Sequence, residues 1–183
     1  MKTICLFVIL LISFASAYNP TYEAVEKLDL QKFAGHWWGI YSNSNSWKAD
    51  IPMNCWNIEF EPSYPKIYAH EHINFNGSQY DLIADCNVTT AAHNDFECVE
   101  EGIEYEWYWF WVNTDYNRAI AYNKHFKSLN FYSRYNTIEK SELDKMIKIA
   151  EGYGYEMTPY NVQPDNTKCK NEIVHEESLA DLQ

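Results

Sequence analysis

The strongest constraint on the fold is a series of eight short segments rich in aromatic and β-branched residues, which follow one another from Phe33 to Arg134. Asn, Gly, Ser and Pro separate these segments, and each of these residue types favours a turn. The composition of the segments favours strands. The expected strands are Trp37–Tyr41, Asn54–Phe60, Lys66–Ile73, Gln79–Val88, Phe96–Val99, Tyr105–Asn113, Arg118–Tyr122 and Leu129–Arg134. Eight successive strands with no helix between them predict an all-β sandwich or barrel.

One helix is expected after the strands, over about residues 138–151. Thr137 is its expected N-terminal cap, Ser141 is an alternative start, and Gly152 is expected to end it. Apolar residues recur at helical spacing in this segment and form a single stripe, made of Leu143, Met146, Ile147 and Ala150. A helix with one apolar stripe must pack that stripe against another element, so we expect it to cover the strands from outside.

Residues 1–17 have the pattern of a secretory signal peptide. The apolar run Ile4–Phe14 follows a basic residue, and the small residues Ala15–Ala17 are those that signal peptidase reads. The apolar run has eleven residues and is therefore too short to span a bilayer. We expect the mature, secreted chain to begin at Tyr18; the alternative is a buried N-terminal helix.

Residues 18–183 are expected to form a single domain, with the strands over about 35–135 and a polar, disordered tail from about residue 170. The full chain has a formal net charge of −12. Such an acidic surface repels phosphate groups and anionic lipids, which argues against a nucleic-acid partner or stable insertion into a membrane. It suits solubility or a cationic partner. We expect a monomer or a weak homodimer.

The cysteine pattern also indicates an oxidising compartment. Cys5 leaves with the signal peptide, and an even number of cysteines remains, namely Cys55, Cys86, Cys98 and Cys169. Four cysteines predict two disulfides with three possible pairings. Glycosylation sequons begin at Asn76 and Asn87 and fit a secreted glycoprotein.

The segment Glu104–Val112 carries the most information about the interior. Alternation along a strand places one set of aromatic residues on a single face, namely Tyr105, Trp107, Trp109 and Trp111. Glu104 and Glu106 share the opposite face with Tyr108, Phe110 and Val112. Because charge prefers water, we expect the tryptophan face to point inward and the later part of the other face to be covered by the helix. The inward face forms either a ligand-binding wall or a packed core. The candidate ligand-binding residues are these four together with Tyr41, Trp56 and Phe131.

Three short motifs resemble those of the lipocalin family, in the same order and spacing. Gly35-His36-Trp37 resembles the Gly-x-Trp motif of the first strand, and Asn113–Tyr116 resembles the Thr-Asp-Tyr motif that follows the sixth strand. Arg134, at the end of the last strand, matches the arginine of the family's third motif. The resemblance implies that Arg134 packs over Trp37 at the closed end of a barrel, beside a short turn at Leu30–Phe33. It assigns structural roles to Gly35, Trp37, Thr114, Asp115, Tyr116 and Arg134.

The resemblance implies an eight-stranded up-and-down antiparallel β-barrel with one helix outside it. Within the family the chain is most similar to the branch of apolipoprotein D and the insect bilin-binding proteins. That branch has a bridge from the second strand to the C-terminal segment, which implies the pair Cys55–Cys169 here and leaves Cys86 to pair locally with Cys98. Its second bridge has no counterpart, because no cysteine lies near Tyr18 and Asn123 stands where the seventh strand would supply one.

The implied function is binding and transport of a small hydrophobic ligand in the lumen, such as a retinoid, bilin, carotenoid, sterol or fatty acid. No other cofactor is expected. One alternative is a scavenger of cationic biogenic amines, which needs inward carboxylates, whereas the alternation above places Glu104 and Glu106 outside. Another alternative is a storage or structural barrel without a dedicated ligand.

No catalytic residue or metal site is expected. The chain lacks the Gly-x-Ser-x-Gly, Cys–His and His-Glu-x-x-His patterns of common enzymes. His70 and His72 share a strand face, but two ligands do not make a zinc site, so we interpret them as solvent-exposed histidines. The pairs Glu97/Glu100 and Glu104/Glu106 are interpreted as a solvated acidic rim.

Overall fold

The computed structural model describes residues 26–44, 52–75, 77–100 and 102–169. The expected signal peptide, the start at Tyr18, the sequon residue Asn76 and the tail from residue 170 lie outside the described residues. No helix among the described residues is long and apolar enough to cross a membrane.

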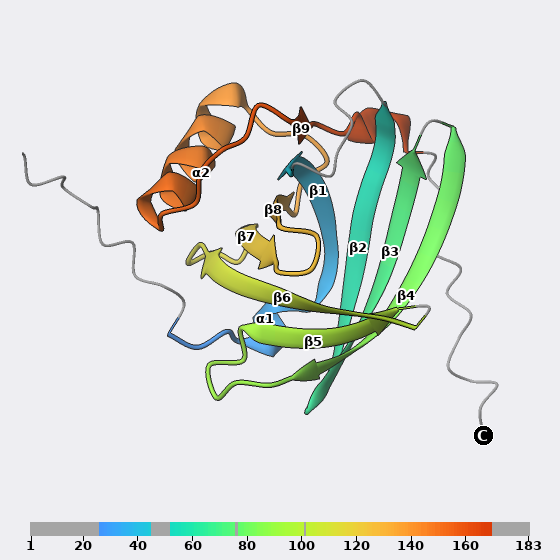
Figure 1. The fold of residues 1–183 in the computed structure, drawn as a ribbon, viewed down its shortest axis with the longest axis vertical. Coiled ribbons are helices and arrows are strands. Elements are labelled where there is room, and N and C mark those ends of the chain that lie inside the picture. The colour runs from blue at the N-terminus through green and yellow to red at the C-terminus, as the bar shows by residue number, and fades with distance from the viewer. Residues whose placement is uncertain (1–25, 45–51, 76, 101, 170–183) are drawn as a thin grey trace, which may run out of the picture.

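Eight antiparallel strands close into a barrel (Figure 1). Their bounds are β1 Gly35–Asn43, β2 Met53–Ser63, β3 Lys66–Phe75, β4 Ser78–Val88, β5 Asp95–Glu100, β6 Ile103–Val112, β7 Arg118–Asn123 and β8 Ser128–Ser133. Each strand pairs with the next along the chain, and β1 pairs with both β2 and β8, which closes the sheet. A short strand, β9 (Asn161–Val162), adds to β1. All eight strands expected from the sequence are therefore present, and the up-and-down barrel is confirmed.

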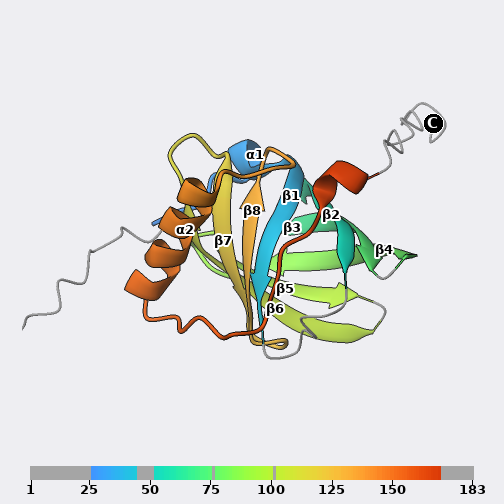
Figure 2. The same cartoon turned by 90° about the horizontal axis from the view of Figure 1, so that it is seen from above.

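The helix α2 (Lys140–Gly152) packs against the outside of the barrel beside β7 and β8 (Figure 2). Its apolar stripe contributes Leu143, Met146 and Ala150 to a cluster with strand residues that face outward. The prediction that Thr137 caps the helix is wrong. The first helical turn is closed instead by the Glu139 carbonyl, which accepts hydrogen bonds from the amides of residues 142 and 143, and no side chain caps the turn.

The short helix α1 (Leu30–Phe33) closes one end of the barrel. The Asp29 side chain accepts hydrogen bonds from the first free amides of α1, which explains where the turn begins. Phe33 is fully buried, and its ring centroid lies 5.1 Å from that of Trp37 and 4.7 Å from that of Trp109. The Trp37 Nε1 group donates to the Phe33 carbonyl over 2.8 Å, so α1 and β1 form one aromatic plug.

Arg134 fastens this closed end. Its guanidinium lies 4.0 Å from the centre of the Trp37 ring and donates hydrogen bonds to the carbonyls of Lys32, Phe33, Ala34, His36 and Tyr116. The packing of Arg134 over Trp37 that the resemblance implies is thus confirmed. Gly35 has a φ of +85°, which a glycine adopts without strain. Thr114 and Asp115 lie in the exposed turn between β6 and β7, before Tyr116.

Two disulfides hold the strands. Cys55 at the start of β2 pairs with Cys169, which follows the 3-10 turn η1 (Asn166–Lys168), and Cys86 of β4 pairs with Cys98 of β5. Both expected pairings are confirmed. The second bridge joins residues that face each other in the ladder between β4 and β5.

Candidate ligand-binding site in the barrel

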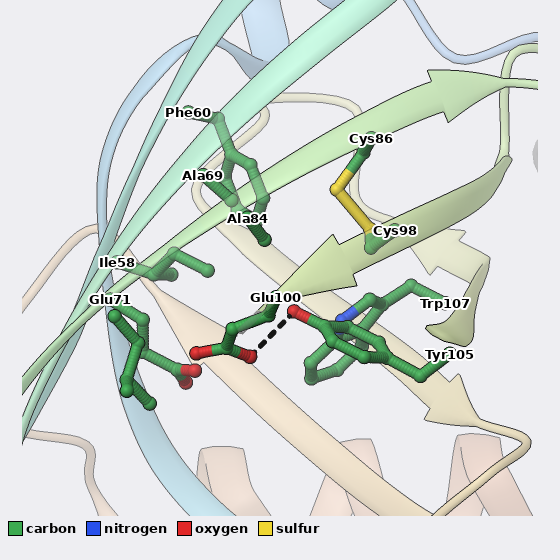
Figure 3. A pocket seen from close by; sticks show the side chains of 11 residues that line it. Ile58, Phe60, Ala69, Glu71, Ala84, Cys86, Cys98, Glu100, Tyr105 and Trp107 are labelled. Atoms are coloured by element: carbon green, nitrogen blue, oxygen red, sulfur yellow. Dashed lines mark hydrogen bonds between the residues drawn. A yellow bond between two sulfur atoms is a disulfide. The ribbon is translucent and has the colours of Figure 1, made fainter. Parts of the chain in front are cut away.

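A pocket lies inside the barrel, between the aromatic plug and the open end. Strands β2 to β6 supply its lining residues, which Figure 3 labels as Ile58, Phe60, Ala69, Glu71, Ala84, Cys86, Cys98, Glu100, Tyr105 and Trp107, together with Leu82. The space that these side chains leave free is about 10 Å³, roughly the volume for the centre of one water molecule. Side chains of the barrel therefore fill most of this pocket. Any larger ligand must move some of them.

The first half of β6 carries ligand-binding residues that the sequence predicts. Tyr105 and Trp107 line the pocket. Trp109 lies below them, fully buried, with its ring stacked 5.8 Å from that of Trp107. Trp56 borders the pocket from β2, because its Nε1 group donates to a carboxyl oxygen of Glu71. These four candidates belong to the same buried cluster.

The expectation that Trp111 shares this inward face is wrong. The ladder between β6 and β7 shifts register between Trp109 and Trp111, so β6 contains a bulge at Phe110. A bulge adds one residue and reverses the alternation that follows it. Trp111 therefore packs in the outer cluster with α2, whereas Val112 packs against the inner one.

Two further candidates also lie outside the lumen. Tyr41 and Phe131 belong to the outer cluster beneath α2, with ring centroids 5.2 Å apart. A second register shift, between Gly39 and Tyr41, reverses the alternation of β1 after Trp37. On β8 the inward position next to Phe131 is taken by Tyr132, which packs with the lumen tryptophans.

Two carboxyl groups lie inside the barrel, and neither is among the ligand-binding residues predicted from the sequence. Glu71 projects from β3 and Glu100 from β5, and both point into the pocket (Figure 3). The Tyr105 hydroxyl donates to Glu100 over 2.9 Å. The interpretation of Glu100 as part of a solvated rim with Glu97 is wrong, because the buried residues of β5 alternate with the exposed Glu97 and put residue 100 in the inward phase.

Burial and like charge shape the electrostatics of this pocket. Burial and, to a smaller extent, the charge of Glu100 raise the pKa of Glu71 to about 7, against the lowering effect of the Trp56 hydrogen bond. Burial, followed by the charges of Glu100 and Glu71, raises the pKa of Tyr105 far above its ordinary range. Near neutral pH the Glu71 carboxyl is therefore about half-protonated, and the pocket exchanges this proton in the physiological range.

Two polar atoms deep in the lumen lack a hydrogen-bond partner within the part of the chain that the structure describes. These are the Tyr132 hydroxyl and the Trp109 Nε1 group, and both side chains are fully buried. Burial first, and then the charges of Glu71 and Tyr105, raises the pKa of Tyr132 well above its ordinary value, so its hydroxyl lies in the field of the Glu71 carboxyl group. Buried polar atoms of proteins are nearly always hydrogen-bonded, so these two call for a partner such as water or a ligand.

The strand histidines His36, His70 and His72 lie on the outer face of the barrel, since they alternate with inward residues of β1 and β3. His72 Nδ1 lies 2.5 Å from Asp81 Oδ1, and His36 Nε2 lies 3.2 Å from Asn57 Oδ1. Burial lowers the pKa of His36. Within the described ranges, no group of three or more His, Cys, Asp or Glu side chains is placed to hold a metal ion.

Comparison with known proteins identifies the fold. No family model and no curated protein matches the sequence. Among solved structures, lobster apocrustacyanin A1 aligns with a TM-score of 0.58 at 14% identity, over 74% of this chain and 78% of that one. The siderocalin Ex-FABP aligns with a TM-score of 0.56 at 15% identity, over 73% and 94%. The cockroach allergen Per a 4 aligns with a TM-score of 0.53 at 15% identity, over 75% and 88%. The closed eight-stranded antiparallel barrel with one outer helix is, in this chain as in those, the lipocalin fold.

Proposed function

We propose that the chain is a secreted lipocalin that binds and carries one small molecule with an apolar body in its barrel. The observation that carries this proposal is the pocket of Figure 3, in which polar groups from several strands converge among aromatic side chains. An apolar cavity with a few oriented polar groups is the usual form of a ligand site. The likeness to a siderocalin that functions through dual ligand specificities supports the proposal.

The geometry narrows the ligand classes. With about 10 Å³ of free space, a long retinoid or carotenoid requires more rearrangement than a compact flat molecule. Two inward carboxyl groups, Glu71 and Glu100, oppose the carboxylate of a fatty acid. The two propionate carboxylates of a bilin meet the same opposition, whereas a sterol has no carboxylate. A compact uncharged or cationic ligand fits best.

Several features of the sequence are consistent with this proposal. The signal peptide at residues 1–17 and the single domain over 18–183 fit a secreted carrier, and the two disulfides support an oxidising compartment. Asn87 is exposed on β4, as a glycosylated residue must be. The bridge Cys55–Cys169 supports the branch of apolipoprotein D and the bilin-binding proteins. We propose no enzymatic activity, and a monomer or weak homodimer.

Tryptophan fluorescence with matched variants tests the proposal. Trp107 lines the pocket, whereas Trp111 lies beneath α2 on the other side of the same strand. Retinol, biliverdin, a sterol and a fatty acid are titrated into the wild-type chain, Trp107→Phe and Trp111→Phe. We expect at least one probe to quench the wild-type chain, with affinity lowered about tenfold in Trp107→Phe and unchanged in Trp111→Phe. No quenching by any of these four probes contradicts carriage of these ligand classes, and an equal loss of affinity in both variants contradicts binding in the lumen.

A further inference from the structure

We propose that the lumen pocket recognises a protonated organic amine, with Glu71 and Glu100 binding the ammonium group and the surrounding aromatic rings binding its apolar body. This inference rests on the proposed function, because it names the chemical class of the ligand in the same pocket.

The two carboxyl groups converge inside the pocket from different strands. They come from strands β3 and β5, and their oxygens point toward the same space (Figure 3). Hydrogen bonds from Trp56 to Glu71 and from Tyr105 to Glu100 orient them. None of the residues that line the pocket is basic. The counter-charge that such a pair needs must therefore come from a proton or from a bound cation.

The Tyr132 hydroxyl is a further polar group in the lumen. Its ring centroid lies 5.3 Å from that of Trp56 and 6.0 Å from that of Trp107, so it is packed between two residues that border the pocket. The side chain is fully buried, and its hydroxyl has no hydrogen-bond partner in the described part of the chain. A primary ammonium has three N–H donors. The two carboxyl groups that line the pocket offer acceptors for such a group, and the Tyr132 oxygen, behind the rings of Trp56 and Trp107, is a further acceptor without a partner among the described residues.

An aromatic surface lies beside the carboxyl groups. Trp107 is partly exposed toward the pocket, and Trp56 and Tyr105 flank the carboxyl groups that they bind. The faces of indole and phenol rings attract cations, and this attraction is strongest where water is excluded. Together, the rings favour a small flat amine over a hydrated metal ion. They also explain why the lumen combines acidic and aromatic residues.

Amine binding is then coupled to pH through Glu71. The groups that face it are Glu100 from β5, Tyr105 from β6, Tyr132 from β8 and the Trp56 indole from β2, and none of these supplies a positive charge. Because burial raises the pKa of Glu71 to about 7, a bound ammonium must displace its proton below that pH. Affinity should thus rise as the pH increases toward 7 and level off above it, with up to tenfold change per pH unit.

Three probes of one shape separate charge from apolar contact. Phenethylamine is cationic, 2-phenylethanol is neutral and phenylacetate is anionic. Isothermal titration calorimetry at pH 8 should show phenethylamine binding at least tenfold more tightly than 2-phenylethanol, and no binding of phenylacetate. Titrations at pH 7 in two buffers of different ionisation enthalpy should show proton release on binding of the amine.

Variants of the pocket identify the residues. Glu71→Gln and Glu100→Gln should each weaken phenethylamine binding at least tenfold and leave 2-phenylethanol unchanged, and Tyr132→Phe should weaken it severalfold. Glu97→Gln, on the exposed side of the same strand as Glu100, is the control and should change nothing. Circular dichroism verifies that each variant is folded.

The two proposals fail in different ways. Equal affinity for the amine and the alcohol, or full amine binding by both glutamine variants, overturns cation recognition and leaves lumen binding intact. Quenching by retinol, biliverdin, the sterol or the fatty acid, with no binding of phenethylamine, also overturns cation recognition and leaves lumen binding intact. The absence of binding by every probe overturns both proposals.

Discussion

Gly39 lies directly against the face of the Trp56 indole. A Cβ atom at position 39 would be 2.0 Å from Cδ2 of Trp56, far inside van der Waals contact. Asn166 holds the same two residues from the C-terminal segment, because its side chain donates to the Gly39 carbonyl and accepts from the Trp56 amide, each over 2.8 Å. The indole fixed in this way donates to Glu71. A residue without a side chain on β1 therefore sets the position of a carboxyl group in the lumen.

Gly39→Ala should displace Trp56 and destabilise the chain by about 2 kcal/mol, the usual cost of overpacking a core. The free energy of unfolding from urea titration measures the loss. Combining Gly39→Ala with Trp56→Phe should restore part of it, because the smaller ring leaves room for the methyl group. If the two losses simply add, the contact between these residues does not control the position of the indole.

Arg134→Ala should lower the free energy of unfolding by about 3 kcal/mol, since it removes charged hydrogen bonds to several carbonyls and the contact with Trp37. Arg134→Lys keeps the charge without the planar fork and should recover only part of the stability. Arg118→Ala is the matched control, because Arg118 donates one side-chain bond, to the Asn117 carbonyl, and packs over Tyr135; its loss should be below about 1 kcal/mol. Equal losses for the two alanine variants contradict this account.

The stability of the ligand-free chain should depend on the protonation of Glu71. The folded chain holds this proton up to a pKa of about 7, whereas the unfolded chain releases it near the ordinary value of 4.5. Unfolding therefore releases a proton between these values, so the stabilisation is complete below pH 4.5 and is lost as the pH rises to 7. The loss amounts to about 3 kcal/mol at most. Glu71→Gln should remove this part of the pH dependence and be more stable than the wild type at pH 8.

The comparison requires urea titrations of wild type, Glu71→Gln and the exposed control Glu97→Gln at pH 5, 6, 7 and 8. The difference between wild type and Glu71→Gln isolates the buried group from the other titrations of the chain. A constant difference across this range shows that Glu71 is ionised in the folded chain throughout.

The two disulfides should contribute unequally. Cys55–Cys169 spans 114 residues and Cys86–Cys98 spans 12. Closing a long loop restricts the unfolded chain more, so the double variant Cys55→Ala/Cys169→Ala should lose about 4–5 kcal/mol and Cys86→Ala/Cys98→Ala about 3 kcal/mol. Urea titrations of the two double variants show which disulfide contributes more to the free energy of unfolding. If the variant without Cys86–Cys98 loses more stability, the packing of this disulfide in the pocket contributes more than the restriction of the unfolded chain.

The sequence predicts the barrel well because strand alternation, turn residues and the three motifs all indicate the same fold. Its prediction of the lumen fails at two bulges, in β1 after Gly39 and in β6 at Phe110. A bulge leaves no clear mark in composition, yet it reverses every later side chain. Tyr41 and Trp111 therefore move from the expected wall to the surface beneath α2.

The inward carboxyl groups were predictable in part. Glu71 lies between His70 and His72, which the sequence analysis places on the outer face, so strict alternation turns it inward. Glu100 lies in phase with Phe96 and Cys98, two inward residues of β5. The expectation that charge prefers water outweighed both patterns. The contacts that hold these groups, from Trp56 and Tyr105, depend on strand pairing and cannot be read from a single segment.

Native mass spectrometry of the protein from its own source, with an absorption spectrum of the same sample, tests ligand binding in the barrel most directly. We predict one small molecule per chain, retained under gentle ionisation and lost when the barrel is unfolded. A compact basic compound would identify the amine class, and a coloured or neutral apolar one would identify a different carrier. A chain that is empty in its native source, and that no probe of either panel enters, would contradict the account.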